Sequence, residues 1–71
     1  MSKPIRIALE LPDDFTAWEL AQFVKRVRFN QAYELTEAHL PRSERTEKAE
    51  AMIRGLTLLQ DALREVHIAP R

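Results

Sequence analysis

Apolar and polar side chains alternate along residues 5–11. The apolar positions are Ile5, Ile7, Leu9 and Leu11. A period of two is typical of a half-buried strand, so a short β-strand is predicted over 5–11, ended by Pro12. A lone strand leaves its backbone groups unpaired. We favour pairing with the same strand of a second molecule; the alternatives are pairing with residues 66–68 or an extended path along the helices.

From residue 13 the apolar period becomes that of a helix. Asp13 or Asp14 is expected to cap it, since a carboxylate favours a helix N-terminus. Its apolar face consists of Ala17, Leu20, Phe23, Val24 and Val27. A break or kink is expected near Phe29-Asn30, and Pro41 ends the stretch. Residues 13–40 therefore form one kinked helix or two helices.

A second long helix is predicted over 44–66, with Ser43 as its N-cap. Its apolar seam from residue 52 steps by four and three, as in a coiled coil. The seam consists of Met52, Leu56, Leu59, Leu63 and Val66. Gly55 costs about 1 kcal/mol inside a helix, and close approach of another helix would explain its presence.

Together these elements predict a mainly α fold in a single domain, residues 1–71. It consists of one strand followed by an antiparallel helical hairpin. A chain of 71 residues builds only a marginal core, so we expect a homodimeric helical bundle. The expected dimer interface is formed by Ile5, Ile7, Leu9, Met52, Leu56, Leu59 and Leu63.

Composition argues against most kinds of chemistry. The formal net charge is zero, and the chain has no Cys and one Gly. Thiolate chemistry and a glycine-rich phosphate loop are therefore excluded. His39 and His67 have no ligand partner at a metal-binding spacing. We predict no catalytic residues, no metal and no cofactor, hence no enzyme. No apolar run is long enough to span a membrane, and the expected location is the cytoplasm.

The densest positive charge is the cluster Lys25, Arg26 and Arg28, near the only tryptophan, Trp18. These four residues are the candidates for binding a partner, since Trp and Arg are enriched where protein partners bind. The competing interpretation is a solvated helix end beside a tryptophan in the core or in a self-interface.

The segments Leu11–Asp14, Ala17–Arg26 and Ala69–Arg71 together resemble a family of small uncharacterised bacterial proteins. Members carry a Leu-Pro-Asp-Asp helix start, an Ala-Trp-x-Leu-Ala-Gln-Phe-x-Lys-Arg helix and a C-terminal Ala-Pro-Arg. An aromatic usually precedes that last motif, where this chain has Ile68. The resemblance implies an accessory protein of a plasmid or integrative element and brings no catalytic residues.

Three functions are therefore weighed. The first is a non-enzymatic protein that binds a protein partner, with an inhibitor of a host defence system as a variant. The second is a ribbon-helix-helix-like DNA-binding regulator, in which Arg6, Ala8 and Glu10 would face the major groove. Its net charge of zero and the long span before the last helix count against it. The third, a small enzyme or metal-dependent module, is the least favoured.

Overall fold

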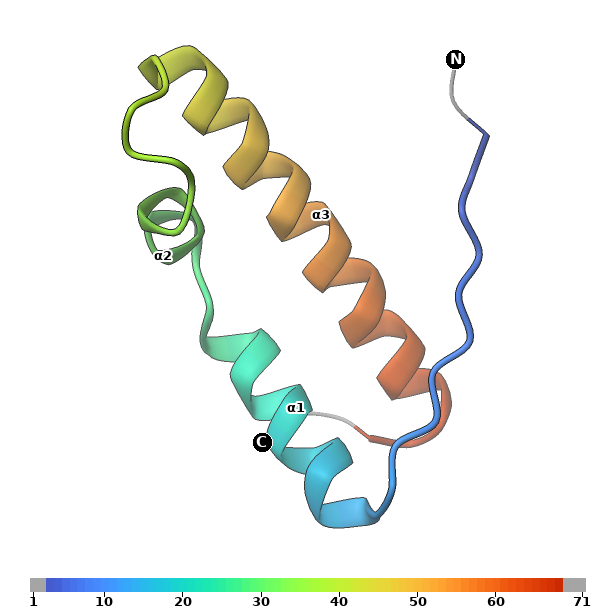
Figure 1. Ribbon diagram of the computed structural model, residues 1–71. Helices are drawn as coiled ribbons and strands as arrows, with labels where there is room; N and C mark the ends of the chain where they lie inside the picture. Colours follow the sequence, from blue (N-terminus) through green and yellow to red (C-terminus); the bar gives the residue numbers. More distant parts are fainter. Residues whose placement is uncertain (1–2, 69–71) are drawn as a thin grey trace.

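The computed structural model describes residues 3–68. Within that range the chain forms three helices: α1 (Asp14–Arg26), α2 (Phe29–Glu34) and α3 (Arg42–Glu65). The long helix α3 packs against both of the others. Figure 1 shows α1 antiparallel to α3 along its C-terminal half, with α2 beside its N-terminal half. The Ala69–Arg71 motif lies outside the described residues.

Helix α1 begins as the sequence predicts. The backbone N–H of Thr16 donates to Oδ1 of Asp13 at 2.7 Å, which makes Asp13 the N-cap. Lys25 and Arg26 occupy the last turn, where positive charge is favourable. Val27 is extended and ends the helix, so the break falls just before the expected position.

The region that follows is less helical than expected. The backbone N–H of Arg28 donates to Oε1 of Gln31 at 2.8 Å, and this bond opens the short helix α2. Residues 35–41 then form turns and bends instead of continuing as helix to residue 40. This connection carries the chain across to the start of α3.

Arg45 holds this connection against α3. Its Nε donates to Oγ1 of Thr36 at 2.8 Å, and its Nη2 donates to the backbone oxygen of Tyr33 at 3.0 Å. The guanidinium carbon also lies 4.3 Å from the centre of the Tyr33 ring, a cation–π distance. Thr36 is itself buried. One side chain therefore joins the end of α2, the turn and the first part of α3.

Helix α3 starts and stops at positions set by its caps. Pro41 is the N-cap, so Ser43 lies in the first turn and not at the capping position that we expected. At the other end, the N–H of Ile68 donates to the oxygen of Leu63 at 2.9 Å, and that of His67 donates to the oxygen of Arg64 at 3.0 Å. His67 has a φ of 68°. This is a Schellman motif, which turns Ile68 back toward Leu63.

The core of the fold is built from small side chains. The buried apolar residues among 3–68 are Ala17, Ala21, Val24, Ala32, Ala49 and Leu63. Alanines let two helices approach closely, but they bury little apolar area, and burial of area is the main favourable term in folding. Many of the larger apolar side chains are exposed, including those of Phe15, Phe23, Leu35 and Leu58.

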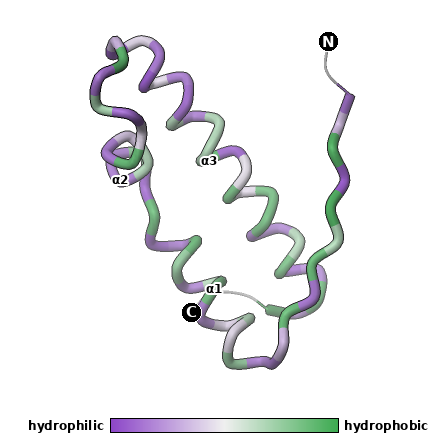
Figure 2. The backbone as a smooth tube through the Cα atoms, in the orientation of Figure 1, coloured by the Kyte–Doolittle hydropathy of each residue, from purple (hydrophilic) through white to green (hydrophobic). Residues whose placement is uncertain are grey.

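The predicted β-strand over 5–11 is wrong. No strand occurs anywhere in residues 3–68, and within this range the backbone of residues 3–12 makes no hydrogen bond. The segment is extended and keeps its alternation of apolar and polar positions (Figure 2). Alternation sets which side chains share a face, but a strand also needs a partner for its backbone groups, and none of the described residues supplies one.

Candidate functional site

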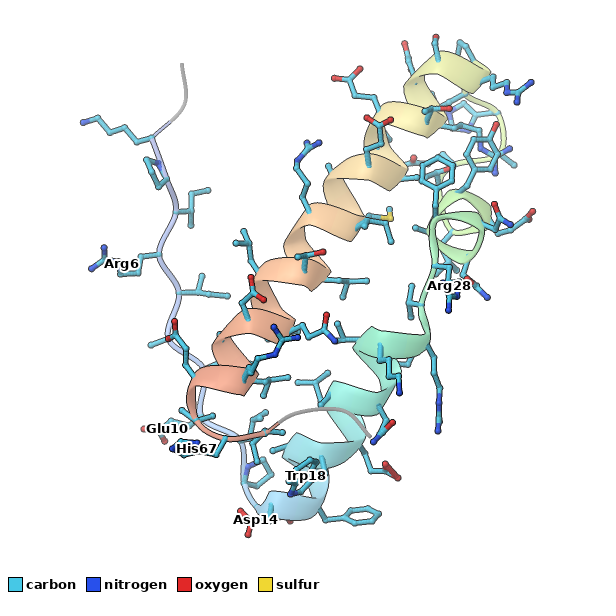
Figure 3. The ribbon with its side chains drawn as sticks, turned by 180° about the vertical axis from the view of Figure 1, so that it is seen from behind. Arg6, Glu10, Asp14, Trp18, Arg28 and His67 are labelled. Carbon is cyan, nitrogen blue, oxygen red and sulfur yellow. The ribbon has the colours of Figure 1, made fainter. Side chains whose placement is uncertain are left out.

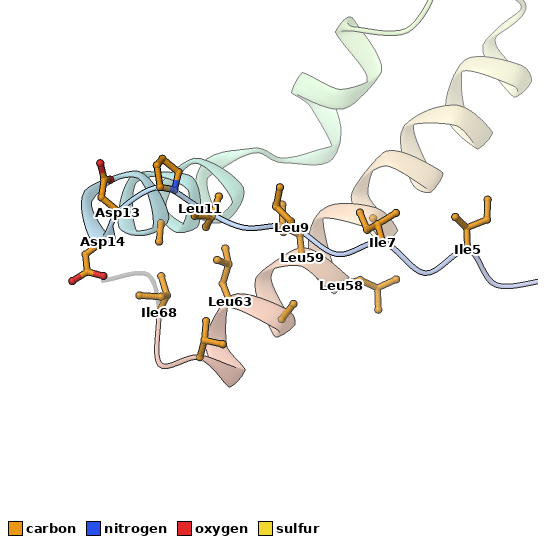
Figure 4. A pocket seen from close by; sticks show the side chains of 15 residues that line it. Ile5, Ile7, Leu9, Leu11, Asp13, Asp14, Leu58, Leu59, Leu63 and Ile68 are labelled. Atoms are coloured by element: carbon orange, nitrogen blue, oxygen red, sulfur yellow. The ribbon is translucent and has the colours of Figure 1, made fainter.

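An open groove of about 900 Å³ lies between the extended segment 3–12 and the C-terminal half of α3. We call it the apolar groove. Its lining residues are Ile5, Ile7, Leu9, Leu11, Pro12, Asp13, Asp14, Ala17, Gly55, Leu58, Leu59, Ala62, Leu63, Val66 and Ile68. Figure 4 shows Asp13 and Asp14 at one end and Ile5 at the other. Among the described residues of the lining, these two aspartates are the only charged ones, so most of the groove surface is apolar.

The large side chains of the groove are not covered by the chain itself. Ile5 is 90% exposed, Ile7 81% and Leu58 69%. Gly55 lies in the middle of α3, and apart from its chain neighbours and the nearby backbone of α3 no described heavy atom lies within 4 Å of the position that a Cβ would take there. The close helix contact that we predicted at Gly55 is therefore not made by another helix of this chain. The groove offers space for an incoming backbone at this point.

The seven predicted dimer-interface residues are divided by the fold. Ile5, Ile7 and Leu9 are exposed along the groove, and Met52 is 40% exposed. Leu56 and Leu59 are half-buried and Leu63 is buried. We expected this seam to contact a second molecule. Its most buried member, Leu63, is already covered within the single chain and offers little area to a partner.

Of the four predicted partner-binding residues, three lie at or just after the C-terminal end of α1, whereas Trp18 lies nearer its N-terminal end. Lys25 and Arg26 end α1 and Arg28 precedes α2, and all three are exposed. Figure 3 shows Arg28 well separated from Trp18. Trp18 is half-buried. It lies two helical turns before Lys25 and therefore on the same side of α1. The fold thus forms a positively charged surface here, which we call the basic cluster and define by Lys25, Arg26 and Arg28.

In the part of the chain that the structure describes, no three His, Asp or Glu side chains are placed to hold a metal ion. The pKa of the Glu37 carboxyl is lowered by the hydrogen bond from its own backbone N–H and by Lys48, whose Nζ lies 3.1 Å away. A shallower hollow beside α3 is lined by Glu44, Glu47, Lys48, Ala51 and Arg54, whose mixed charges offset one another.

The chain matches a protein family described as a family of unknown function, DUF7706, over residues 1–71. The chain is a member of DUF7706. No curated protein and no solved structure matches it significantly. The expected likeness to a small uncharacterised family is therefore confirmed. Between residues 3 and 68, none of its helices is long and apolar enough to cross a membrane.

Asp13, the N-cap of α1, lies at one end of the groove, and its carboxyl group can be protonated. The hydrogen bonds from Thr16, first from its backbone N–H, lower the pKa of Asp13 below its ordinary value. A carboxyl whose pKa is lowered on folding stabilises the fold above its unfolded pKa. That contribution is lost as the pH falls below about 4, toward the lower folded value.

We therefore expect Asp13→Ala to lower the melting temperature of this DUF7706 chain at pH 7. Asp13→Asn keeps a capping oxygen but cannot titrate, so it should lose less at pH 7. The difference in melting temperature between the wild type and Asp13→Asn should shrink as the pH is lowered from 5 to 3. Thermal unfolding followed by circular dichroism measures both effects. A difference that stays constant over this range would contradict the account.

Two features of the structure were missed from sequence. The Arg45 contacts join residues 9 and 12 positions apart, which the periodicity of a single helix does not indicate. Ile68 lines the groove because the Schellman motif turns the chain back toward Leu63. The apolar alternation in 5–11 did mark one wall of the groove, although it was interpreted as a strand.

Proposed function

We propose that this protein is a non-enzymatic interaction protein that acts by binding other protein chains. The observation that supports this most directly is the apolar groove, in which large aliphatic side chains stand exposed beside a core of alanines. Soluble monomers rarely leave a large contiguous apolar patch open, and such patches are typical of surfaces that bind proteins. The groove carries no arrangement of nucleophile, base and anion-binding groups that a reaction would require.

The basic cluster supplies a second binding surface, separate from the groove, for a partner with an acidic surface. Arg26 and Arg28 are both exposed, Arg26 in the last turn of α1 and Arg28 just before α2. Exposed arginines at the rim of an interface act mainly on the rate and specificity of association. We therefore assign the groove to apolar binding and the basic cluster to selection of the partner.

The setting that we propose follows from the sequence resemblance. We infer an accessory protein of a bacterial mobile element such as a plasmid, acting in the cytoplasm, where a chain without cysteine loses nothing to reducing conditions. Inhibition of a host defence system belongs to the same class, since it also requires binding to a protein. The DNA-binding alternative relied on a two-stranded ribbon, and the strand that would form it is not present in residues 3–68.

Capture of partners by the tagged full-length chain tests this function. We expect a specific protein to be recovered from cells by the wild type, before and after nuclease treatment. The double variant Arg26→Glu, Arg28→Glu should recover less of it, while Arg54→Glu, an exposed position on α3, should recover as much as the wild type. Recovery of only nucleic-acid-associated proteins, lost on nuclease treatment, would instead support a DNA-binding role and contradict the proposal.

A further inference from the structure

We infer that the apolar groove is covered by a second copy of the same chain, related by a two-fold axis. This inference rests on the proposed function and names the protein that fills the groove. Four observations carry it: the area that the single chain leaves exposed, the apolar lining, the open space at Gly55 and the distribution of charge along the extended segment.

The single chain exposes far more surface than a compact monomer. Its accessible area is 6269 Å² for a mass of 8.3 kDa, whereas a compact monomer of this mass exposes about 4,600 Å². Its radius of gyration is 14.0 Å, against about 11 Å expected for a compact domain of this length. The excess area is about 1,700 Å², and a stable dimer of standard size buries about 800 Å² on each partner. Pairing through one face therefore requires less area than the chain has in excess.

Gly55 indicates where the second copy approaches most closely. A glycine inside a helix is unfavourable unless its missing side chain serves packing. Within residues 3–68 no side chain fills the space at Gly55, although the exposed Leu58 lies on the same helix and both line the groove. A second helix crossing at this point would use the space and would cover Leu58.

Charge along the extended segment favours a two-fold arrangement. Lys3 and Arg6 lie toward the end of the groove marked by Ile5, whereas Asp13 and Asp14 close the opposite end. A two-fold axis across the middle of the groove reverses one copy relative to the other. The positive end of each copy then faces the negative end of its partner. A parallel arrangement would bring like charges together.

Sedimentation equilibrium of the purified full-length chain across micromolar concentrations tests the inference. The wild type should show twice the mass of one chain. Gly55→Glu should weaken association at least tenfold, because it fills the crossing point with a charged side chain in a buried interface. The same change replaces glycine with a better helix former, so helical content by circular dichroism should not fall. Leu35→Glu, exposed and outside the groove, should associate like the wild type.

A pair of charge reversals tests the orientation without touching the core. Arg6→Glu should weaken association several-fold, and adding Asp14→Arg to it should restore part of the loss. A wild type that stays monomeric, or a dimer that Gly55→Glu leaves intact, would overturn the inference. A monomer that still captures a partner in a way that depends on Arg26 and Arg28 would overturn the inference but would support the proposed function. A dimer that captures nothing would keep this inference and contradict binding to a further partner.

Discussion

Replacement of Leu63 by alanine is expected to lower the free energy of unfolding by about 2–5 kcal/mol. Leu63 is 5% exposed and is the largest of the buried apolar side chains in the described residues. The other members of that core are alanines and one valine, so the Leu63→Ala variant loses the largest side chain of a core that buries little apolar area. Since small domains have only a few kcal/mol of stability in total, the variant should be largely unfolded at moderate urea.

Urea unfolding followed by circular dichroism, at one fixed protein concentration, measures this effect. Leu35→Ala is the matched control, because Leu35 is 76% exposed and truncation of an exposed leucine changes stability by about 0.5 kcal/mol or less. Similar midpoints for the two variants would contradict the assignment of Leu63 to the core. They would mean that α1 and α3 are held together by other contacts.

Replacement of Arg45 by alanine should be the second most damaging change, with a loss of about 2 kcal/mol. It removes two hydrogen bonds from a charged donor and the stacking on Tyr33 at once. Thr36 is buried at the centre of this contact. In the variant, the Thr36 hydroxyl still donates a hydrogen bond to the backbone oxygen of Tyr33. It no longer accepts the hydrogen bond that Arg45 donates in the wild type.

Arg45→Lys separates charge from geometry. A lysine keeps the positive charge but cannot donate in two fixed directions as a guanidinium does, so we expect it to recover only part of the loss. Arg54→Ala, an exposed position on the same helix, should leave the urea midpoint close to that of the wild type. Full recovery by Arg45→Lys would show that the charge alone stabilises the turn.

The parts of the fold that depend on local sequence could be predicted. The Asp13 cap requires only an acidic side chain three residues before a free backbone N–H. Helix α3 follows from a long apolar period, although Pro41 moved its start by two residues because proline suits the position before the first turn. The length of α2 could not be predicted in this way, because its end is fixed by Arg45 reaching Thr36 and Tyr33 from another helix.

The surfaces were harder to predict than the helices. Phe23 belonged to the predicted apolar face of α1, but the structure leaves it 59% exposed and buries Ala21 instead. Helical periodicity gives the direction of a stripe, whereas the width of the contact depends on how closely the neighbouring helix approaches. The small alanine face allows a close approach that leaves Phe23 outside. For residues 5–11, the period of two located an apolar edge, but it could not show whether another segment pairs with the backbone.

The most direct test of the account is site-specific photo-crosslinking in cells, with a benzoylphenylalanine in place of Leu58. Leu58 is exposed and lines the apolar groove, so the account predicts a covalent adduct at that position with the mass of two chains. The same group in place of Leu35, which is equally exposed but outside the groove, should give no such adduct. Irradiation that joins no protein to position 58 would contradict the central claim that this groove is a protein-binding surface.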